Sequence, residues 1–269
     1  MSIQTYRQLC QKNDAENYLL DKLIFRKISI FITILFIKVG ITANQTTFLS
    51  LVASLASLYF LTFNTRTALI IAAGLIFSYY ILDHVDGELA RYAVQTGKSK
   101  PNVKGHYFDV LVHRYSSNLM VFFMSLGIYN QYGYKWAVLL GFLGCIGISS
   151  FPNVVAAQVI AGKIARQKEA VFTDPALIKI LAELEKKQLQ IQAVHHGSLF
   201  DKSLKLLIES LFFPGHIILL ILTLLIDAFW PGFPTFNLRC VFLVSFTLLY
   251  TVKTLMQSIL WLIKLKQIS

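Results

Sequence analysis

Apolar runs separated by short polar segments follow one another along the chain from residue 45 onward. A helix needs roughly 20 apolar residues to cross a hydrocarbon core about 30 Å thick, and in lipid its backbone groups must pair within the helix. The pattern therefore predicts an all-α, polytopic membrane protein with one domain over residues 1–269. Asn44 or Thr42 can cap the first span. Six transmembrane helices are expected, near residues 45–63, 67–83, 107–129, 136–161, 205–229 and 240–263.

The segment before these spans, residues 14–38, holds an apolar run that is too short to cross a membrane comfortably. Basic side chains surround the run, at Lys22, Arg26, Lys27 and Lys38. A short amphipathic helix flanked by basic residues is typical of the bilayer surface. We therefore expect an interfacial amphipathic helix on the cytoplasmic face.

A long basic loop, residues 163–205, separates the fourth and fifth spans. Apolar residues in its centre recur at helical spacing and predict an amphipathic helix. This helix is expected to lie on the bilayer surface, and covering a site or docking a second subunit are the alternatives. The residues that carry the pattern are Leu177, Ile180, Leu181, Leu184 and Ile191.

Composition and charge agree with this map. Hydrophobic residues make up 55% of the chain and charged residues 14%, which leaves too little polar surface for a soluble domain of this length. Twenty Lys and Arg fall in both termini and the 91–104 and 163–205 loops, against three on the other side. The positive-inside rule then places both termini and both loops in the cytoplasm. Because the net charge of +11 flanks the spans, it indicates membrane lipids, and not nucleic acid, as the partner.

The stretch DHVDGELAR, residues 83–91, places acidic groups at the end of the second span. If the helix continues, Asp83, Asp86, Gly87 and Ala90 share one face. Two carboxylates three apart can bind a cation jointly, the small residues leave room for a ligand, and Arg91 is well placed for a phosphate. Carboxylates close to a membrane span are costly and usually functional, whereas capping and interface charge are the alternative.

The third span begins with a matching pattern, because Asp109 and His113 are four residues apart and Gly105 precedes them by one turn. Three aspartates and a histidine from two neighbouring helices can form an oxygen-rich site for Mg²⁺ or Mn²⁺. The sequence thus predicts a metal site at the membrane surface.

These residues resemble the signature of the CDP-alcohol phosphatidyltransferases. In words, that signature is Asp, two residues, Asp-Gly, two residues, Ala-Arg, a spacer, then Gly, three residues, Asp, three residues and Asp. The upstream ITANQTT resembles the family's Pro-Asn-x-x-Thr element, with Ala43 where proline is common. The positions that match are Asp83, Asp86, Gly87, Ala90, Arg91, Gly105 and Asp109, with Asn44 and Thr47 upstream.

The chain departs from the signature in two ways. The spacer between Arg91 and Gly105 has thirteen residues and is longer than is usual in the family. His113 stands where the fourth Asp is expected, a position that in the family both holds metal and takes the proton of the attacking alcohol. A neutral imidazole with a pKa near ~6.5 is a competent base, but it lowers the number of anionic ligands from four to three. We therefore expect two ions, Mg²⁺ or Mn²⁺, with the binding of one weakened and transition metals favoured there.

The resemblance implies a role for each residue. Asp83, Asp86, Asp109 and His113 would be the metal ligands, with His113 also the catalytic base. Arg114 and the spacer lysines are weaker assignments, to a phosphate of the donor or acceptor. The nucleotide would be surrounded by Asn44, Thr47, Gly87, Ala90, Arg91 and Gly105, and the spacer lysines are Lys98, Lys100 and Lys104.

The function implied is transfer of a substituted phosphate from a CDP-linked donor to an alcohol acceptor, with release of CMP, in the synthesis of a phospholipid or related phosphodiester. The lipid is either the donor, as CDP-diacylglycerol, or the acceptor. Homodimerisation is implied by the resemblance alone. Two alternatives stay open: a degenerate member that binds nucleotide or lipid as a scaffold, and a transporter, against which the chain shows no inverted repeat.

Overall fold

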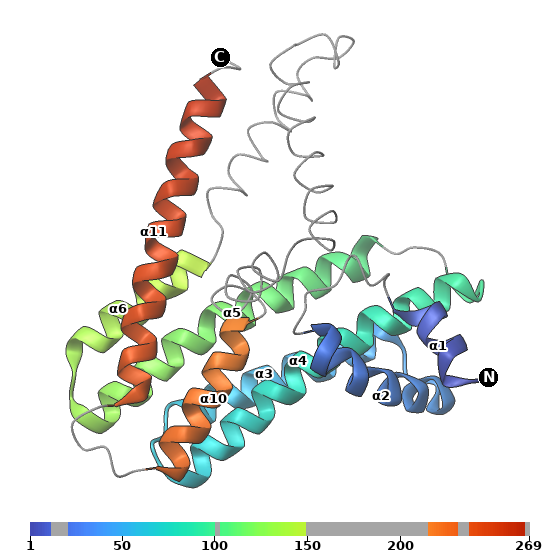
Figure 1. The fold of residues 1–269 in the computed structure, drawn as a ribbon, viewed down its shortest axis with the longest axis horizontal. Coiled ribbons are helices and arrows are strands. Elements are labelled where there is room, and N and C mark those ends of the chain that lie inside the picture. The colour runs from blue at the N-terminus through green and yellow to red at the C-terminus, as the bar shows by residue number, and fades with distance from the viewer. Residues whose placement is uncertain (12–20, 100–102, 149–214, 231–236, 267–269) are drawn as a thin grey trace, which may run out of the picture.

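The structure is a computed structural model, and it describes residues 1–11, 21–99, 103–148, 215–230 and 237–266 (Figure 1). Within these ranges the chain is helical and contains no strand. The elements in order are α1 (Ile3–Cys10), a π-helical turn η2 (Asp21–Phe25), α2 (Arg26–Val39), α3 (Ala43–Leu61), α4 (Arg66–Gln95), α5 (Val103–Tyr132), α6 (Lys135–Ile148), α10 (Gly215–Phe229) and α11 (Leu238–Lys266).

Helix α4 is at the centre of the bundle, because α1, α2, α3 and α10 all pack against it. Helix α5 packs against α3 and α6, and α11 packs against α6. The core is formed by apolar and aromatic side chains that are almost fully buried. The largest include Phe25, Ile76, Tyr79, Tyr80, Met120, Met124, Ile128 and Leu220.

Each predicted span overlaps a helix of the structure. Of the described helices, α4 and residues 238–263 of α11 are long and apolar enough to cross a membrane, whereas α6 and α10 are shorter apolar helices. The count of six transmembrane helices therefore stays a prediction. The predicted amphipathic helix of the 163–205 loop lies outside the described residues, as does part of the predicted interfacial segment 14–38.

Local sequence explains where α2 ends and α3 begins. Gly40 has φ of 83° and caps α2 in the left-handed conformation, which glycine adopts without steric cost. Thr42 then caps α3, and its hydroxyl and backbone N–H pair with the backbone and side chain of Gln45 in a capping box. Of the two expected caps, Thr42 is therefore the one used.

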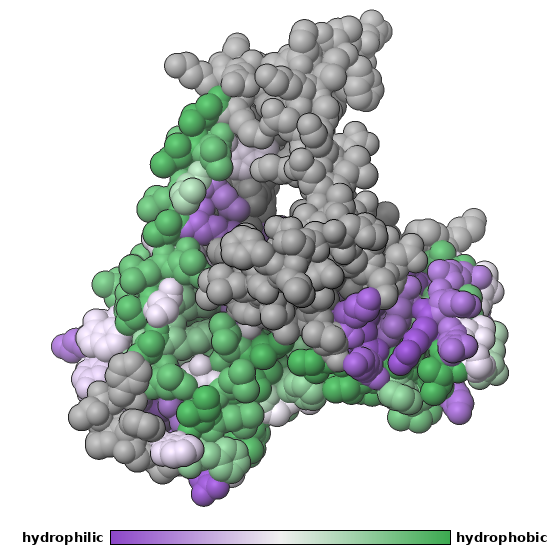
Figure 2. Space-filling model, viewed as in Figure 1, coloured by the Kyte–Doolittle hydropathy of each residue, from purple (hydrophilic) through white to green (hydrophobic). Residues whose placement is uncertain are grey.

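The surface of the bundle is largely apolar. In Figure 2 hydrophobic residues cover most of the visible helices, while the broadest hydrophilic area lies at the end of the molecule that holds α1. Large apolar side chains on the outer faces of α3, α6 and α11 are more than half exposed. Examples are Phe48, Leu55, Leu139, Phe142, Leu255 and Leu262. Because soluble proteins rarely expose apolar patches of this extent, the surface is suited to lipid.

Gly127 of α5 tests the packing of α5 on α3. A Cβ at this position would clash with the backbone oxygen of Leu61, which cannot move without shifting the helix, whereas a Cβ at Gly74 would meet nothing within 4 Å. We expect Gly127→Ala to destabilise the protein by about 1–3 kcal/mol through overpacking. Gly74→Ala, the matched control, should be neutral or slightly stabilising, because alanine favours helix more than glycine does.

Thermal unfolding in detergent, followed by circular dichroism, measures the difference between the two variants. Equal midpoints for Gly127→Ala and Gly74→Ala would contradict the close approach of α5 to α3.

Candidate active site

The predicted site residues come from three helices that meet at one end of the bundle. Asp83 and Asp86 lie in the second half of α4, Asp109 and His113 lie in the first half of α5, and Thr47 lies near the start of α3. Helix α3 packs against both α4 and α5, and the segments that carry Asp83 and His113 meet each other. The structure therefore brings together side chains that are up to 66 residues apart in sequence.

His113 contacts two residues of α4. Its Nδ1 lies 3.1 Å from the hydroxyl of Tyr79 and 3.4 Å from Oδ1 of Asp83. The rings of Tyr79 and His113 also stack, with centroids 6.3 Å apart. The imidazole is thus oriented by a phenol and a carboxylate on the same ring nitrogen, and the carboxylate stabilises a proton on that nitrogen.

Asp86 lies beyond the predicted span, which ends at residue 83, and it is buried, with 4% of its surface exposed. Its Oδ2 accepts a hydrogen bond of 2.7 Å from Oγ1 of Thr47. Burial, followed by the charges of Asp83 and Asp109, raises the pKa of Asp86 to about 8. Repulsion between the carboxylates therefore costs energy at this end of the bundle, and a bound cation would relieve it.

Within the part of the chain that the structure describes, no three His, Cys, Asp or Glu side chains lie close enough to hold a metal ion as they stand. Asp83 is turned toward His113, and Asp86 is turned toward Thr47. Three carboxylates and an imidazole are nevertheless a donor set that suits Mg²⁺ or Mn²⁺. A cation fits the charge of the site, and binding it requires these carboxylates to turn from their present partners.

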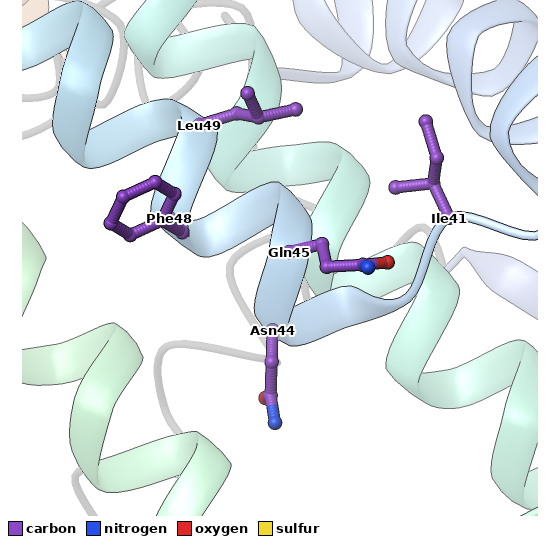
Figure 3. Close-up of a pocket in the computed structure, with 5 residues that line it drawn as sticks. All are labelled: Ile41, Asn44, Gln45, Phe48 and Leu49. Atoms are coloured by element: carbon purple, nitrogen blue, oxygen red, sulfur yellow. The ribbon is translucent and has the colours of Figure 1, made fainter.

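The residues expected around a nucleotide occupy different environments. Asn44 is exposed at the start of α3, beside a hollow that Figure 3 shows together with Ile41, Gln45, Phe48 and Leu49. Thr47 does not line this hollow and faces Asp86 instead. Ala90 is exposed, and Gly87 and Gly105 are partly buried.

Arg91 contacts the N-terminal segment, which is the part of the chain from α1 to the end of α2 at Val39. Its Nε donates a hydrogen bond to the backbone carbonyl of Cys10, and its guanidinium lies beside Gly87, one turn earlier on α4. The role of Arg91 in binding a phosphate stays a prediction. Because the contact with Cys10 fixes the stem of the side chain, any phosphate must approach from the remaining edge of the guanidinium.

Four basic residues were assigned more weakly to a phosphate, and the two whose side chains are described lie at the surface. Arg114 is exposed, and Lys98 lies over the ring of Tyr92 with its Nζ 5.3 Å from the centroid. Lys100 lies outside the described residues, and only the backbone of Lys104 is described.

Tyr79 and Glu88 are two buried polar residues of this region that sequence reasoning did not identify. Tyr79 is fully buried and contacts His113. Glu88, within the DGELAR stretch, is fully buried and accepts hydrogen bonds from α2 and from Gln11. The sequence offered a signal for each: Tyr79 lies one turn before Asp83, and Glu88 is a third acidic residue in an apolar helix.

Residues 40–196, more than half of the chain, match the family described as CDP-alcohol phosphatidyltransferase. The chain belongs to this family. No curated protein matches it.

The CDP-alcohol phosphatidyltransferase family consists of transferases of lipid synthesis. Its members move a phosphate-linked group from a CDP-alcohol to an alcohol acceptor that is often a lipid, and they use a divalent metal. Together with the apolar helices, the family indicates a membrane protein. The match includes all three aspartates and His113 but not the segment before Gly40.

Two adjacent threonines of α3 test the contact between α3 and the acidic cluster formed by Asp83, Asp86 and Asp109. Thr47 donates to the buried Asp86, whereas the hydroxyl of the equally buried Thr46 donates to the carbonyl of Thr42 in the preceding turn. We expect Thr47→Val to lower the free energy of unfolding by about 1–3 kcal/mol, because it leaves a buried oxygen of Asp86 without its donor. Thr46→Val should cost less.

Unfolding in detergent, measured for both variants, checks the expectation. A Thr46→Val variant that is as unstable as Thr47→Val would show that the bond to Asp86 contributes nothing of its own.

Proposed function

We propose that the protein is an integral-membrane transferase that moves a substituted phosphate from a CDP-linked donor to an alcohol acceptor and releases CMP. Membership of the CDP-alcohol phosphatidyltransferase family supports the reaction class. The observation that carries the assignment to this chain is the convergence of Asp83, Asp86, Asp109 and His113 from α4 and α5. The site and both termini are assigned to the cytoplasm by the distribution of basic residues.

In this proposal the aspartates would hold the divalent ions, with His113 as a further ligand and the ion beside it bound more weakly. A bound cation neutralises the pyrophosphate of the donor and stabilises the leaving CMP. The nucleotide would lie against Gly87 and the exposed Ala90, near Asn44, Thr47, Arg91 and Gly105. Arg114 and Lys98 are both exposed and would meet a phosphate from the solvent side.

His113 would act as the base. The acceptor hydroxyl forms a bond to the β-phosphorus, the bond between that phosphorus and the oxygen of CMP breaks, and the hydroxyl proton passes to the imidazole. Asp83, 3.4 Å from Nδ1, stabilises the imidazolium that results, and Tyr79 fixes the plane of the ring. The general base and its orienting partners are therefore supplied by this chain.

One observation favours a second candidate function. His113 occupies the position of an acidic ligand and pairs with Asp83. The site is therefore also consistent with a protein that binds nucleotide or lipid as a scaffold and does not turn over. Under either function we expect a homodimer, and this expectation rests on the family resemblance alone.

Release of CMP tests the proposed function directly. With purified protein in nanodiscs, a divalent metal and a panel of CDP-linked donors and alcohol acceptors, we expect turnover in the wild type. His113→Ala and Asp109→Asn should each lower kcat by about 10²- to 10⁴-fold, since each removes a group that acts on the reacting atoms. Asp227→Asn, which breaks an ion pair with Arg239 between α10 and α11, is the matched control and should keep activity.

Binding of CDP without release of CMP from any donor would favour the scaffold. Turnover that survives in Asp109→Asn would exclude the acidic cluster as the site.

Metal titration tests the consequence of His113 separately from turnover. We expect the wild type to bind one ion more weakly than the other, because imidazole supplies no negative charge. Mn²⁺ should be preferred over Mg²⁺ at the weaker site, because imidazole suits transition metals better than it suits Mg²⁺. His113→Asp should tighten that site by about tenfold. Two equally tight Mg²⁺ sites in the wild type would contradict this expectation.

A further inference from the structure

Glu88 is fully buried, two residues after Asp86 on α4, and its carboxylate is held by the N-terminal segment. Its Oε1 accepts hydrogen bonds of 2.9 Å from Nε2 of Gln11 and 2.7 Å from Oγ of Ser29. Its Oε2 accepts one of 2.6 Å from Oγ1 of Thr33. We call these four residues, Gln11, Ser29, Thr33 and Glu88, the Glu88 cluster.

The cluster is energetically costly unless it is complete. A carboxylate removed from water requires several strong donors, and loss of one leaves a buried charge partly unsatisfied. Arg26 adds a favourable charge, with Nη1 3.8 Å from Oε1, too far for a hydrogen bond. Gln11 also donates to the backbone oxygen of Arg26 at 2.8 Å, so the cluster fixes the segment that follows α1 against the start of α2 as well.

The same face of α4 makes two further contacts with the N-terminal segment. One turn earlier, Nε2 of His84 lies 3.3 Å from Oδ1 of Asp21, and two turns earlier the hydroxyl of Tyr80 donates a hydrogen bond of 2.9 Å to the same oxygen. One turn later, Arg91 donates to the carbonyl of Cys10. Polar contacts therefore run along about three turns of α4, beside the turn that carries Asp83 and Asp86.

Helix α2 makes its contacts with α4 through a buried face that is partly polar. Its buried face carries the polar residues Ser29 and Thr33, whereas Phe31 and Leu35 on the other face are more than half exposed. A helix that presents polar groups to the protein and apolar groups outward is suited to lie against lipid. In a membrane, the N-terminal segment would thus connect the bilayer surface to α4.

From this arrangement we propose that Glu88 is a positioning residue. By binding the N-terminal segment, it fixes the part of α4 that presents Asp86 and Arg91 to the substrates. This inference rests on the proposed function. The matched family residues begin at Gly40, so the partners of Glu88 lie outside them. Beyond Glu88 this end of α4 also contacts α1, since Arg91 donates to the carbonyl of Cys10 and the rings of Tyr92 and Tyr6 lie 6.2 Å apart. Displacement of such a helix end by about 1 Å is enough to lower turnover 10²-fold.

The test combines turnover with a readout of the N-terminal segment itself. Cys10 is fully buried, and burial followed by the charge of Glu88 raises the pKa of its thiol to about 11, so reaction with N-ethylmaleimide should be slow. In a background of Cys145→Ser and Cys240→Ser, the rate of labelling at Cys10 reports whether the segment has left α4. Thr33→Val is the main variant because it removes one bond without changing charge, and Glu88→Gln is the second.

Thr46→Val is the matched control, since Thr46 is equally buried but bonds only to its own helix. We expect Thr33→Val and Glu88→Gln to speed the labelling of Cys10 and to lower kcat by about 10- to 100-fold, with a smaller effect on KM for the CDP-linked donor. The control should change neither. A positioning role requires kcat to fall in variants whose thermal midpoint matches that of Thr46→Val.

Faster labelling with unchanged kcat would overturn the proposal and leave Glu88 a purely structural residue. Unchanged labelling in both variants would also overturn it, because the cluster would then not hold the segment. A wild type that releases no CMP would instead contradict the proposed function. In that case the affinity for CDP in the presence of Mn²⁺ is measured in place of turnover. Equal affinity in Thr33→Val and Thr46→Val would then contradict the positioning role.

Discussion

Buried carboxylates on α4 are the constraint around which the rest of the bundle is arranged. At about 100° per residue, Asp86 and Glu88 point about 160° apart, so each faces a different set of helices. Glu88 is satisfied by three donors from the N-terminal segment and by the nearby Arg26. Asp86 accepts one hydrogen bond from Thr47 and experiences repulsion from Asp83 and Asp109. One carboxylate is thus structurally complete, while the other lies in a site that favours a cation.

This difference links packing to chemistry. The polar side of α4 that faces α2 fixes the rotation of the helix, and that rotation determines where Asp83 and Asp86 point. Helix α3, capped at Thr42, supplies Thr47 on the opposite side, and α5 brings Asp109 and His113 to the same end. The outer faces of the bundle remain apolar, which suits a protein that works at a lipid surface.

Much of the fold could be predicted from sequence, because hydrophobic runs mark helices without knowledge of their neighbours. Each of the six predicted spans overlaps a helix, and α4 continues past Asp83 as the acidic pattern required. Helix α1 was not predicted, since its eight residues mix apolar and polar side chains and are too few to mark a span. The candidate residues Asp83, Asp86, Asp109 and His113 were recognisable from their helical spacing and from the resemblance to the family signature, and their role as a metal site stays a prediction.

The partners of individual side chains could not be predicted. Gln11, Ser29 and Thr33 reach Glu88 across 55 to 77 residues of sequence, and no local pattern marks such contacts. Arg91 was assigned to a phosphate from its place in the motif, yet its Nε is used by the carbonyl of Cys10, which depends on how α1 packs. Tyr79 was read as part of an apolar run, although its hydroxyl contacts His113.

The central claim is that the cluster formed by Asp83, Asp86, Asp109 and His113 is a cation-dependent nucleotide site. Calorimetric titration of CDP into the purified protein, with Mn²⁺ and with EDTA, tests it most directly. The account predicts that CDP binds with Mn²⁺, that EDTA abolishes binding, and that Asp86→Asn weakens it while Asp227→Asn does not. Equal affinity for CDP in Mn²⁺ and in EDTA, or unchanged affinity in Asp86→Asn, would contradict it.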